Sequence, residues 1–372
     1  MIKSWDFTNE YKYLKKDILK SINKILKNDN LFFGKELSEF EKKFLKKNKS
    51  KYGIGVASGT DALYLSLKAL NIGKNDEVIT VANTAIPTVS AIINTGATVK
   101  FVDVGDDYLI DVKKIEKSIT NRTKAIIPVH LYGQSCDMDG ITKIAKKYKI
   151  KIIEDCAQAQ GAKFKNKKVG TFGITGCFSF YPTKILGAYA DGGFITTNNI
   201  KIYQKVRRLR FYGIEQIDST KWWNNKYFAV ENGTNSRLGE IQAGILNIKH
   251  KYLNKWIKRR REIAQLYNNN IKNINLKLPQ ENLKNFHVYH LYVVAHKKRD
   301  LILKKMKKNN IFLGIQYPYP IHKMLAYKKL TKINSNHLKK TEIFSKQIFS
   351  LPIYPTIENS KIKKIIKILN QI

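Results

Sequence analysis

Residues 124–155 read KAIIPVHLYGQSCDMDGITKIAKKYKIKIIED. The pattern predicts an apolar strand over Lys124–His130, a helix over Asp139–Tyr148 and a second strand over Lys151–Asp155. A strand, a helix and a strand in this order form a βαβ unit with parallel strands. Such alternation implies a largely parallel sheet that is covered by helices on both faces. This stretch therefore predicts an α/β fold.

The same alternation continues from this unit toward the N-terminus. Further strands are predicted over Tyr52–Ala57, Glu77–Val81 and Thr98–Asp103, and further helices up to Leu70 and over Thr84–Asn94. Residues 1–50 differ, because they carry only the helical patterns Tyr11–Leu26 and Leu37–Phe44. We therefore expect an N-terminal helical arm ahead of the sheet.

Toward the C-terminus the pattern changes. Two short apolar strands are predicted over Cys177–Tyr181 and Gly193–Thr197, and one long helix over 238–258. The later residues are expected to hold a strand over Tyr289–Ala295 and helices over Arg299–Lys308, Lys340–Phe349 and Ser360–Leu369. This change predicts an N-terminal arm with a large domain in residues 1–245 and a smaller α/β domain in residues 246–372.

The balance of charge is strongly basic. The 372 residues include 68 Lys and Arg against 29 Asp and Glu, which gives a formal net charge of +39 at pH 7. Proteins that bind nucleic acid have such a balance, but few of these residues are Arg and the lysines are spread over the whole chain. We therefore expect no nucleic-acid partner and keep polyanion binding as an alternative function. A basic surface also favours a small anionic substrate.

Cysteine content and hydropathy bear on the compartment. The three cysteines form no CxxC pair, so neither a disulfide framework nor a metal site is expected, and a reducing compartment fits. The N-terminal residues MIKSWDFTNEYKYLKK lack the apolar stretch of a signal peptide. No segment approaches the roughly 20 apolar residues that span a bilayer. We therefore expect a soluble, cytoplasmic protein without a membrane partner.

Three groups of polar residues follow predicted strands, where an open parallel sheet binds its ligands. Ser58, Gly59 and Thr60 open a helix whose free N–H groups suit a phosphate, although Ser and Thr are also ordinary N-caps. Residues 154–158, EDCAQ, are as typical of a solvated loop as of a binding site. Residues 178–184, FSFYPTK, place a lysine in a loop between apolar strands.

The surroundings of that lysine, Lys184, are unusual. Gly, Ala and aromatic neighbours are expected to desolvate its ammonium and lower its pKa, as a lysine needs when it bonds covalently to a cofactor. A phosphate site, a strand-end Asp155 and such a lysine are what pyridoxal 5'-phosphate requires. The aspartate would keep the ring nitrogen protonated, and the lysine would shuttle a proton. Chain order and spacing allow this interpretation without deciding it.

Motifs along the whole chain carry a resemblance to one family. The motifs are SGTDALYLSL at 58–67, PVHLYGQ at 128–134, EDCAQAQGA at 154–162, FSFYPTK at 178–184, ADGG at 190–193, GTNSRLGEIQAGIL at 233–246, HVYHLYVV at 287–294 and LPIYP at 351–355. In this order they resemble the sugar aminotransferases of the DegT/DnrJ/EryC1/StrS family, which have the aspartate-aminotransferase fold (fold type I). The set is far more specific than any single motif.

The resemblance implies three residues at the reacting part of the cofactor. Lys184 matches the lysine that bonds to pyridoxal phosphate and acts as acid and base. Asp155 matches the partner of the pyridine nitrogen, and Gln158 matches the residue beside the phenolic oxygen. During turnover the cofactor is expected to alternate with pyridoxamine 5'-phosphate. A lysine rather than the histidine of the family's dehydratases favours transamination.

The resemblance also implies how the phosphate is held and how the chain assembles. Gly59, Thr60 and Ser179 match ligands of the cofactor phosphate within one subunit. Asn235 matches an asparagine that reaches the phosphate of the neighbouring subunit's cofactor. The family works as a dimer with its sites at the interface, so a homodimer is implied.

Candidate substrate residues and one departure from the family pattern remain. Tyr181, Tyr317 and His322 are candidate substrate residues, and the alternative for each is a role in packing. Ala85 stands where many relatives place an aromatic residue that stacks on the cofactor ring. The resemblance therefore does not identify the stacking partner.

The substrates follow from the resemblance as well. The family aminates nucleotide-linked ketosugars, usually with glutamate as donor. Residues 233–246 and 317–322 look most like members that aminate carbon 3 of dTDP-linked 3-keto-6-deoxyhexoses, and such amino sugars usually enter surface glycans. The alternative is amination at carbon 4 of a dTDP- or UDP-linked 4-keto sugar. A cofactor-holding regulator without turnover is a further alternative.

Overall fold

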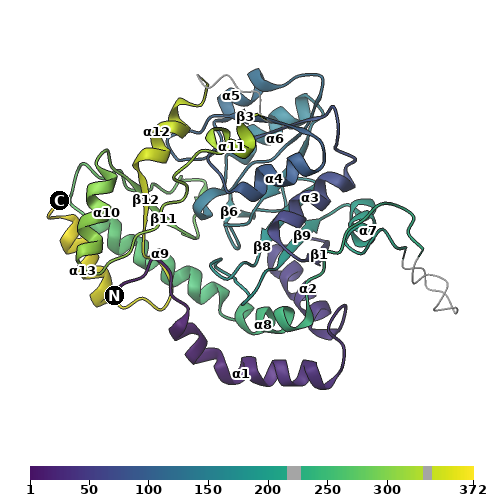
Figure 1. Ribbon diagram of the computed structural model, residues 1–372, viewed down its shortest axis with the longest axis horizontal. Coiled ribbons are helices and arrows are strands. Elements are labelled where there is room, and N and C mark those ends of the chain that lie inside the picture. The colour runs from purple at the N-terminus through teal and green to yellow at the C-terminus, as the bar shows by residue number, and fades with distance from the viewer. Residues whose placement is uncertain (216–227, 330–336) are drawn as a thin grey trace.

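The central feature of the fold is a seven-stranded sheet with the strand order β1-β9-β8-β5-β4-β2-β3 (Figure 1). The computed structural model describes residues 1–215, 228–329 and 337–372. The strands are β1 (Tyr52–Val56), β2 (Glu77–Val81), β3 (Thr98–Val102), β4 (Thr123–Ile126), β5 (Lys151–Asp155), β8 (Thr175–Ser179) and β9 (Gly193–Thr197). Neighbours from β3 to β8 pair in parallel, whereas β9 is antiparallel to both β8 and β1. The predicted α/β fold with a largely parallel sheet is confirmed.

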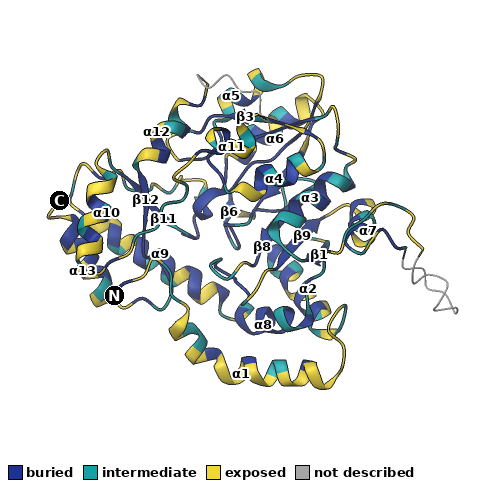
Figure 2. Cartoon of the chain, in the orientation of Figure 1, coloured by how far each residue is buried: buried dark blue, intermediate teal, exposed yellow. Residues whose placement is uncertain are grey.

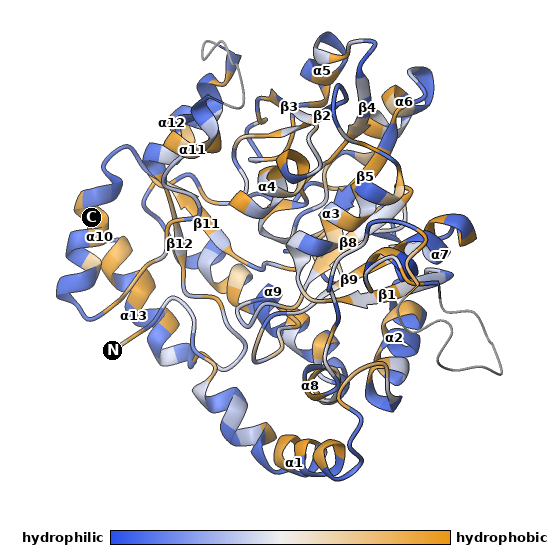
Figure 3. Ribbon diagram, turned by 45° about the vertical axis from the view of Figure 1, so that its right-hand side comes forward, coloured by the Kyte–Doolittle hydropathy of each residue, from blue (hydrophilic) through white to orange (hydrophobic). Residues whose placement is uncertain are grey.

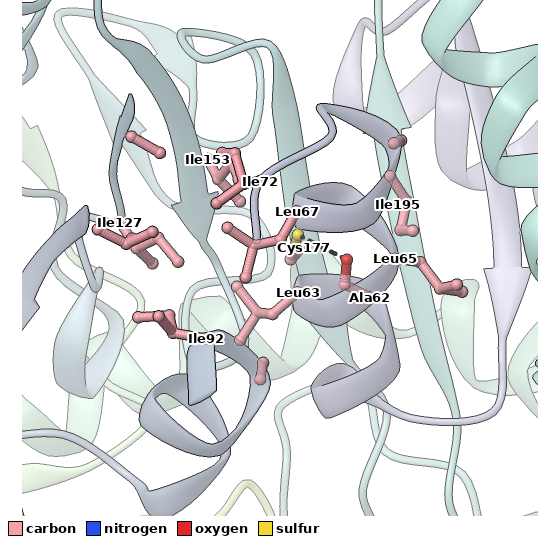
Figure 4. Packing of buried hydrophobic residues seen from close by; sticks show 14 of the residues in the cluster. Ala62, Leu63, Leu65, Leu67, Ile72, Ile92, Ile127, Ile153, Cys177 and Ile195 are labelled. Carbon is pink, nitrogen blue, oxygen red and sulfur yellow. Dashed lines mark hydrogen bonds between the residues drawn. The ribbon is translucent and has the colours of Figure 1, made fainter. Parts of the chain in front are cut away.

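Helices cover both faces of this sheet, because successive strand residues point to opposite sides. One face carries α3 (Gly59–Ala69), α4 (Ile86–Asn94) and α7 (Ile200–Leu209), and the other carries α5 (Val112–Ile115) and α6 (Met138–Lys147). Ile153 packs in the cluster on the first face, in which Figure 4 also labels Leu63, Leu67 and Ile92. Its neighbour Ile152 packs in the cluster on the second face.

The N-terminal arm and two later helices form a separate layer. They are α1 (Thr8–Lys27), α2 (Lys35–Asn48), α8 (Glu240–His250) and α9 (Leu253–Asn270). Leu14 and Ile18 of α1 are buried in a cluster with Ile245 of α8, whereas most of α1 is exposed (Figure 2). A salt bridge of 2.6 Å between Glu10 and the buried Lys249 fixes α1 to α8.

The prediction of a single long helix over 238–258 is wrong, because two helices, α8 and α9, occupy this stretch. The amides of Lys251 and Tyr252 donate to the carbonyls of Ile248 and Lys249, three residues back instead of four. This tighter turn ends α8 before α9 begins. The apolar spacing of the sequence continues through the turn, so it does not reveal the break.

The C-terminal part of the chain forms a smaller α/β layer, and both chain termini lie beside it (Figure 1). Strands β11 (Tyr292–Ala295) and β12 (Ile348–Leu351) form an antiparallel pair, which packs with α9, α10 (Arg299–Lys308) and α13 (Asn359–Leu369). The other helices and strands are α11 (Leu325–Lys328), α12 (Lys339–Gln347) and the short strands β6 (Lys163–Phe164), β7 (Lys167–Lys168) and β10 (Asn285–Phe286).

The helix predicted over Lys340–Phe349 is too long, because Ile348 and Phe349 instead pair with β11. The division between residues 1–245 and 246–372 stays a prediction.

The surface helices carry hydrophilic and hydrophobic stretches side by side, as expected for helices that cover a sheet (Figure 3). Within the three described ranges, no helix has the length and apolar character needed to cross a membrane.

Candidate active site

A cavity of about 220 Å³ lies where β1, β5 and β8 end. The predicted site residues that line it are Gly59, Thr60, Asp155, Gln158, Ser179, Tyr181 and Lys184. The start of α4 contributes Thr84, Ala85 and Thr88, and Asp191 also lines the cavity. Most of the predicted site thus comes together at the carboxyl ends of the strands, as the topology requires.

The turn from β1 into α3 offers free backbone donors. The Ser58 hydroxyl accepts from the amide of Asp61 at 3.1 Å, so this side chain caps α3. The amides of Gly59 and Thr60 have no acceptor within the described part of the chain. A Cβ at Gly59 would lie 2.7 Å from the Cβ of Ser179, so only glycine lets the turn approach the end of β8 so closely. Free amides at a helix N-terminus beside a hydroxyl suit a phosphate.

Asp155, at the end of β5, is a buried carboxylate, with an exposed fraction of 4%. Its Oδ1 accepts from the amide of Ala157 at 3.1 Å, and its Oδ2 accepts from the hydroxyl of Thr88 at 2.8 Å. Burial raises its pKa, although these hydrogen bonds and the charge of Lys184 act in the opposite direction. No ion pair to Asp155 forms among the described residues. A ligand with a protonated nitrogen would supply the missing cation.

Lys184 lies in the loop after β8, where its amide donates to the carbonyl of Tyr181 at 2.8 Å. Burial lowers the pKa of its side-chain amine to about 8, and the charge of Asp155 opposes this shift. About half of the amines are therefore neutral near pH 8, and the neutral amine is the nucleophilic form. The desolvation expected from the sequence is present.

The amide group of Gln158 is held in one orientation. Its Oε1 accepts from the amide of Tyr132 at 2.8 Å, and its Nε2 donates to the hydroxyl of Tyr317 at 2.9 Å. Tyr317 does not line the cavity but is thus one hydrogen bond away from it, and burial raises its pKa, which keeps it a phenol. Tyr181, with an exposed fraction of 51%, lies at the cavity rim.

Besides Tyr317, two further predicted residues lie outside this cavity. The Nε2 of His322 is 3.0 Å from Oε1 of Glu342, and its ring is buried near Phe101. Asn235 forms a β-bridge with Phe211, on the segment that precedes α8. The structure does not bring either side chain to the cavity of the same chain.

Sequence reasoning missed Thr88, which bonds Asp155 directly. Its hydroxyl also lies 2.9 Å from that of Thr84, so a short polar chain leads to the carboxylate. The only signal in the sequence is a polar residue in the first turn of a helix that follows a strand.

The position where many relatives place a stacking aromatic residue is occupied by Ala85, which is the N-cap of α4. Tyr181 is the only aromatic among the described lining residues.

Glu154, the residue before Asp155, points to the opposite side of β5 and has another task. Its Oε1 accepts from the amides of Phe172 and Gly173, each at 2.7 Å. Its Oε2 accepts from the amide of Gly170 at 2.8 Å and lies 3.1 Å from Nε2 of His130. The other ring nitrogen of this histidine accepts an amide N–H, so Nε2 carries the proton that it donates. This carboxylate holds the loop that leads into β8.

Comparison with known proteins connects this geometry to a family. Residues 12–370 match the DegT/DnrJ/EryC1/StrS aminotransferase family. The chain belongs to this family. It is 39% identical to dTDP-3-amino-3,4,6-trideoxy-alpha-D-glucose transaminase of Micromonospora megalomicea subsp. nigra, over 99% of this chain and 98% of the relative. It is 43% identical to dTDP-3-amino-3,6-dideoxy-alpha-D-galactopyranose transaminase of Aneurinibacillus thermoaerophilus, over 96% of this chain and 95% of the relative.

Two solved structures share the fold. A family member from Brucella abortus superposes with a TM-score of 0.94 at 31% identity, covering 100% of this chain and 99% of that one. NtdA from Bacillus subtilis, solved with bound cofactor PMP, gives a TM-score of 0.87 at 30% identity, covering 96% and 81%. The predicted aspartate-aminotransferase-like fold is therefore confirmed.

The chain is thus a pyridoxal-phosphate-dependent aminotransferase. The residues described above fit this cofactor: free amides for a phosphate, a buried carboxylate without a cation and a desolvated amine share one cavity. When bound, pyridoxal phosphate supplies an electron sink that lets an amino group pass between two substrates.

Proposed function

We propose that this enzyme converts a dTDP-linked 3-keto-6-deoxyhexose into the 3-amino-3,6-dideoxyhexose, with glutamate as amino donor. Support comes from the two relatives at 39% and 43% identity, both named for a dTDP-3-amino sugar. A relative from Acidithiobacillus ferrooxidans, 38% identical, is named UDP-N-acetyl-3-dehydro-alpha-D-glucosamine 3-aminotransferase. The names agree on carbon 3 but differ in the nucleotide, so carbon 3 is the better supported part of the proposal.

In this proposal the side chains around the cofactor ring have different roles. Lys184 Nζ takes up and returns the proton that moves during amino transfer, and its lowered pKa of about 8 allows both directions. The carboxylate of Asp155 holds a proton on the ring nitrogen, and Thr88 keeps that carboxylate oriented. Gln158, fixed by its two hydrogen bonds, would contact the phenolic oxygen of the cofactor.

The outer residues would bind the phosphate and the sugar. The amides of Gly59 and Thr60, with the hydroxyl of Ser179, would hold the cofactor phosphate. Tyr181 at the rim and Tyr317 behind Gln158 are placed to contact the substrate. For His322 the same role is proposed, but its contact with Glu342 gives less support.

We also propose a homodimer with a cavity at each side of the interface. Large apolar side chains are exposed on segments next to the cavity or next to Asn235: Leu31, Phe32, Ile86, Tyr181 and Tyr212. Exposed apolar residues gathered in this way mark an interaction surface. The position of Asn235 outside its own cavity supports a contact with the cofactor phosphate of the partner subunit.

The deciding experiment is a half-reaction with isolated enzyme. Glutamate first converts the bound cofactor to its pyridoxamine form, the glutamate is removed, and ketosugars are added one at a time while the cofactor absorbance is followed. We expect rapid return of the pyridoxal absorbance with a dTDP-linked 3-keto-6-deoxyhexose. Return with 4-keto sugars alone would instead establish amination at carbon 4.

A regulatory role is the second candidate. The chain is 36% identical to a pleiotropic regulatory protein of Geobacillus stearothermophilus and 34% identical to the erythromycin biosynthesis sensory transduction protein EryC1 of Saccharopolyspora erythraea. A cofactor-loaded protein that transfers no amino group across a broad sugar panel would favour this role. A surface glycan as destination and a cytoplasmic location stay predictions.

A further inference from the structure

A second and larger cavity, of about 580 Å³, lies beside the segment that leads into β1, whereas the cofactor cavity lies where β1 ends. It is lined by Lys49, Lys163, Lys168, Lys258 and Arg261 among other residues, and it shares no lining residue with the cofactor cavity. The end of α2, the β6–β7 hairpin and the middle of α9 contribute these side chains. We call it the lysine cavity.

The four lysines of this cavity lack acidic partners. Within residues 1–215, 228–329 and 337–372, none of Lys49, Lys163, Lys168 and Lys258 forms an ion pair, whereas ten lysines elsewhere in these ranges do. The one carboxylate in the lining, Glu262, lies 3.6 Å from Arg259 and is partly neutralised by it. Arg261 is paired with Glu281 at 2.7 Å, so the positive charge that the protein itself does not compensate comes from the four lysines.

The hairpin holds two of these lysines together. Lys163 and Lys168 are directly paired residues of the antiparallel strands β6 and β7, so their side chains leave the hairpin on the same face. The Nζ of Lys163 and the guanidinium of Arg261 lie over the ring of Phe286, at 5.3 Å and 4.4 Å from its centre. These contacts place cations along the cavity wall before any ligand arrives.

One of these lysines, Lys168, is partly buried among other positive charges. The Nζ of Lys168 donates to the carbonyl of Gly161 at 3.1 Å, its one hydrogen bond within the described residues. Burial and the positive charges of Lys163, Lys47 and Lys49 lower the pKa of Lys168 to about 8. An anion among these ammonium groups would relieve both effects.

We propose that the lysine cavity binds a small oligophosphate anion of the diphosphate class, at a site separate from the cofactor. A diphosphate group concentrates several negative charges in a small volume and presents oxygens to several ammonium donors at once. The cavity is concave and local, which favours such a ligand over an extended nucleic-acid strand. The inference does not depend on which ketosugar the enzyme aminates.

The first test measures binding of inorganic diphosphate to the holoenzyme, whose cofactor phosphate site is already filled. Isothermal titration at physiological salt compares wild type with Lys163→Gln/Lys168→Gln, and with Lys304→Gln/Lys363→Gln as a control of equal charge change. Lys304 and Lys363 are exposed residues of α10 and α13. We expect the cavity variant to lose at least about tenfold in affinity and the control to stay within about twofold.

A second readout identifies the residue that binds. Because the neutral amine reacts, Lys168 should be acylated faster than Lys304 near pH 8, and diphosphate should slow the acylation of Lys168 alone. Mass spectrometry of peptides after a short pulse of acetic anhydride measures both rates. Nucleoside diphosphates are tested beside inorganic diphosphate, and protection by either supports the proposal.

Three results would overturn the proposal. One is an equal loss of affinity in the cavity and control variants, which would mean that net charge alone attracts the anion. Another is absence of diphosphate binding by wild type at physiological salt. The third is protection of Lys168 by single-stranded RNA but not by any diphosphate. Cofactor absorbance and circular dichroism of each variant show whether it is folded.

Discussion

The hydrogen bond from Thr88 to Asp155 gives the sharpest prediction from the site. Its hydroxyl donates to Oδ2 at 2.8 Å, and the only other hydrogen bond to this carboxylate among the described residues comes from the amide of Ala157. Thr88→Val keeps the shape of the side chain and removes the donor. The carboxylate then loses one of the two hydrogen bonds that stabilise its charged form.

The size of the effect follows from the strength of that bond. A hydrogen bond to a charged group contributes about 1.5–3 kcal/mol, and one pKa unit corresponds to about 1.4 kcal/mol. We therefore expect the pKa of Asp155 in cofactor-free protein to rise by about one to two units. The carboxylate of the variant is therefore protonated at a higher pH than that of wild type. Its pairing with the cofactor nitrogen is lost at that higher pH as well.

The assay is a titration of cofactor-free protein with pyridoxal phosphate between about pH 5 and about pH 9. At the alkaline end both proteins have an ionised carboxylate and should bind equally. Toward the acid end the variant should bind increasingly more weakly, by up to about ten- to hundredfold, because more of its pairing site is protonated. Both proteins bind the same cofactor, so the effect of the cofactor's own ionisation cancels when one affinity is divided by the other. Thr88→Ser, which keeps a hydroxyl, should follow wild type.

Two results would refute this reasoning. A ratio that stays constant over the whole pH range would show that Thr88 does not act through the charge of Asp155. A Thr88→Ser variant that behaves like Thr88→Val would show that packing around the residue matters rather than its hydroxyl.

The other predictions concern the lysine, the carboxylate beside Asp155 and the proposed interface. Lys184→Ala should lose the borohydride-trapped cofactor adduct seen by mass spectrometry, and retention of the adduct would place the bond on another lysine. Glu154→Gln should lower the free energy of unfolding by about 3 kcal/mol in denaturant titrations, because an uncharged amide cannot accept from four donors; an unchanged midpoint would contradict the role of this carboxylate. Asn235→Ala should weaken cofactor binding, and mixing it with Lys184→Ala subunits should restore turnover, because one site of each mixed dimer is intact. A mixture no more active than its parts would argue against a contact across the interface.

The sequence was sufficient for features that depend on neighbouring residues. Of the strands that carry the site, β5 has the predicted limits Lys151–Asp155 and β1 ends one residue before its predicted end. The strand predicted over Cys177–Tyr181 is β8, which begins and ends two residues earlier, at Thr175 and Ser179. Lys184 could be singled out because the residues that desolvate it are its neighbours in the chain.

Features that depend on distant residues could not be predicted from one sequence. Thr88 and Asp155 are 67 residues apart, and Gln158 and Tyr317 are 159 apart, so no local pattern connects them. The end of α12 was misjudged for the same reason, because pairing with β11 decides that Ile348 is extended. His322 and Asn235 came from the resemblance alone, and their proposed contacts need substrate or a second subunit.

The opposite orientation of Glu154 and Asp155 also protects the alignment of β5 in the sheet. If this strand slipped by one residue against its neighbours, every side chain would change face. Glu154 would enter the cofactor cavity, and Asp155 would lie where four donors now meet a longer side chain. Each buried carboxylate would lose its partners, at a cost of several kcal/mol. Two adjacent acids thus make misaligned forms of the strand unfavourable, so the residues that serve the chemistry also help to select the correct pairing during folding.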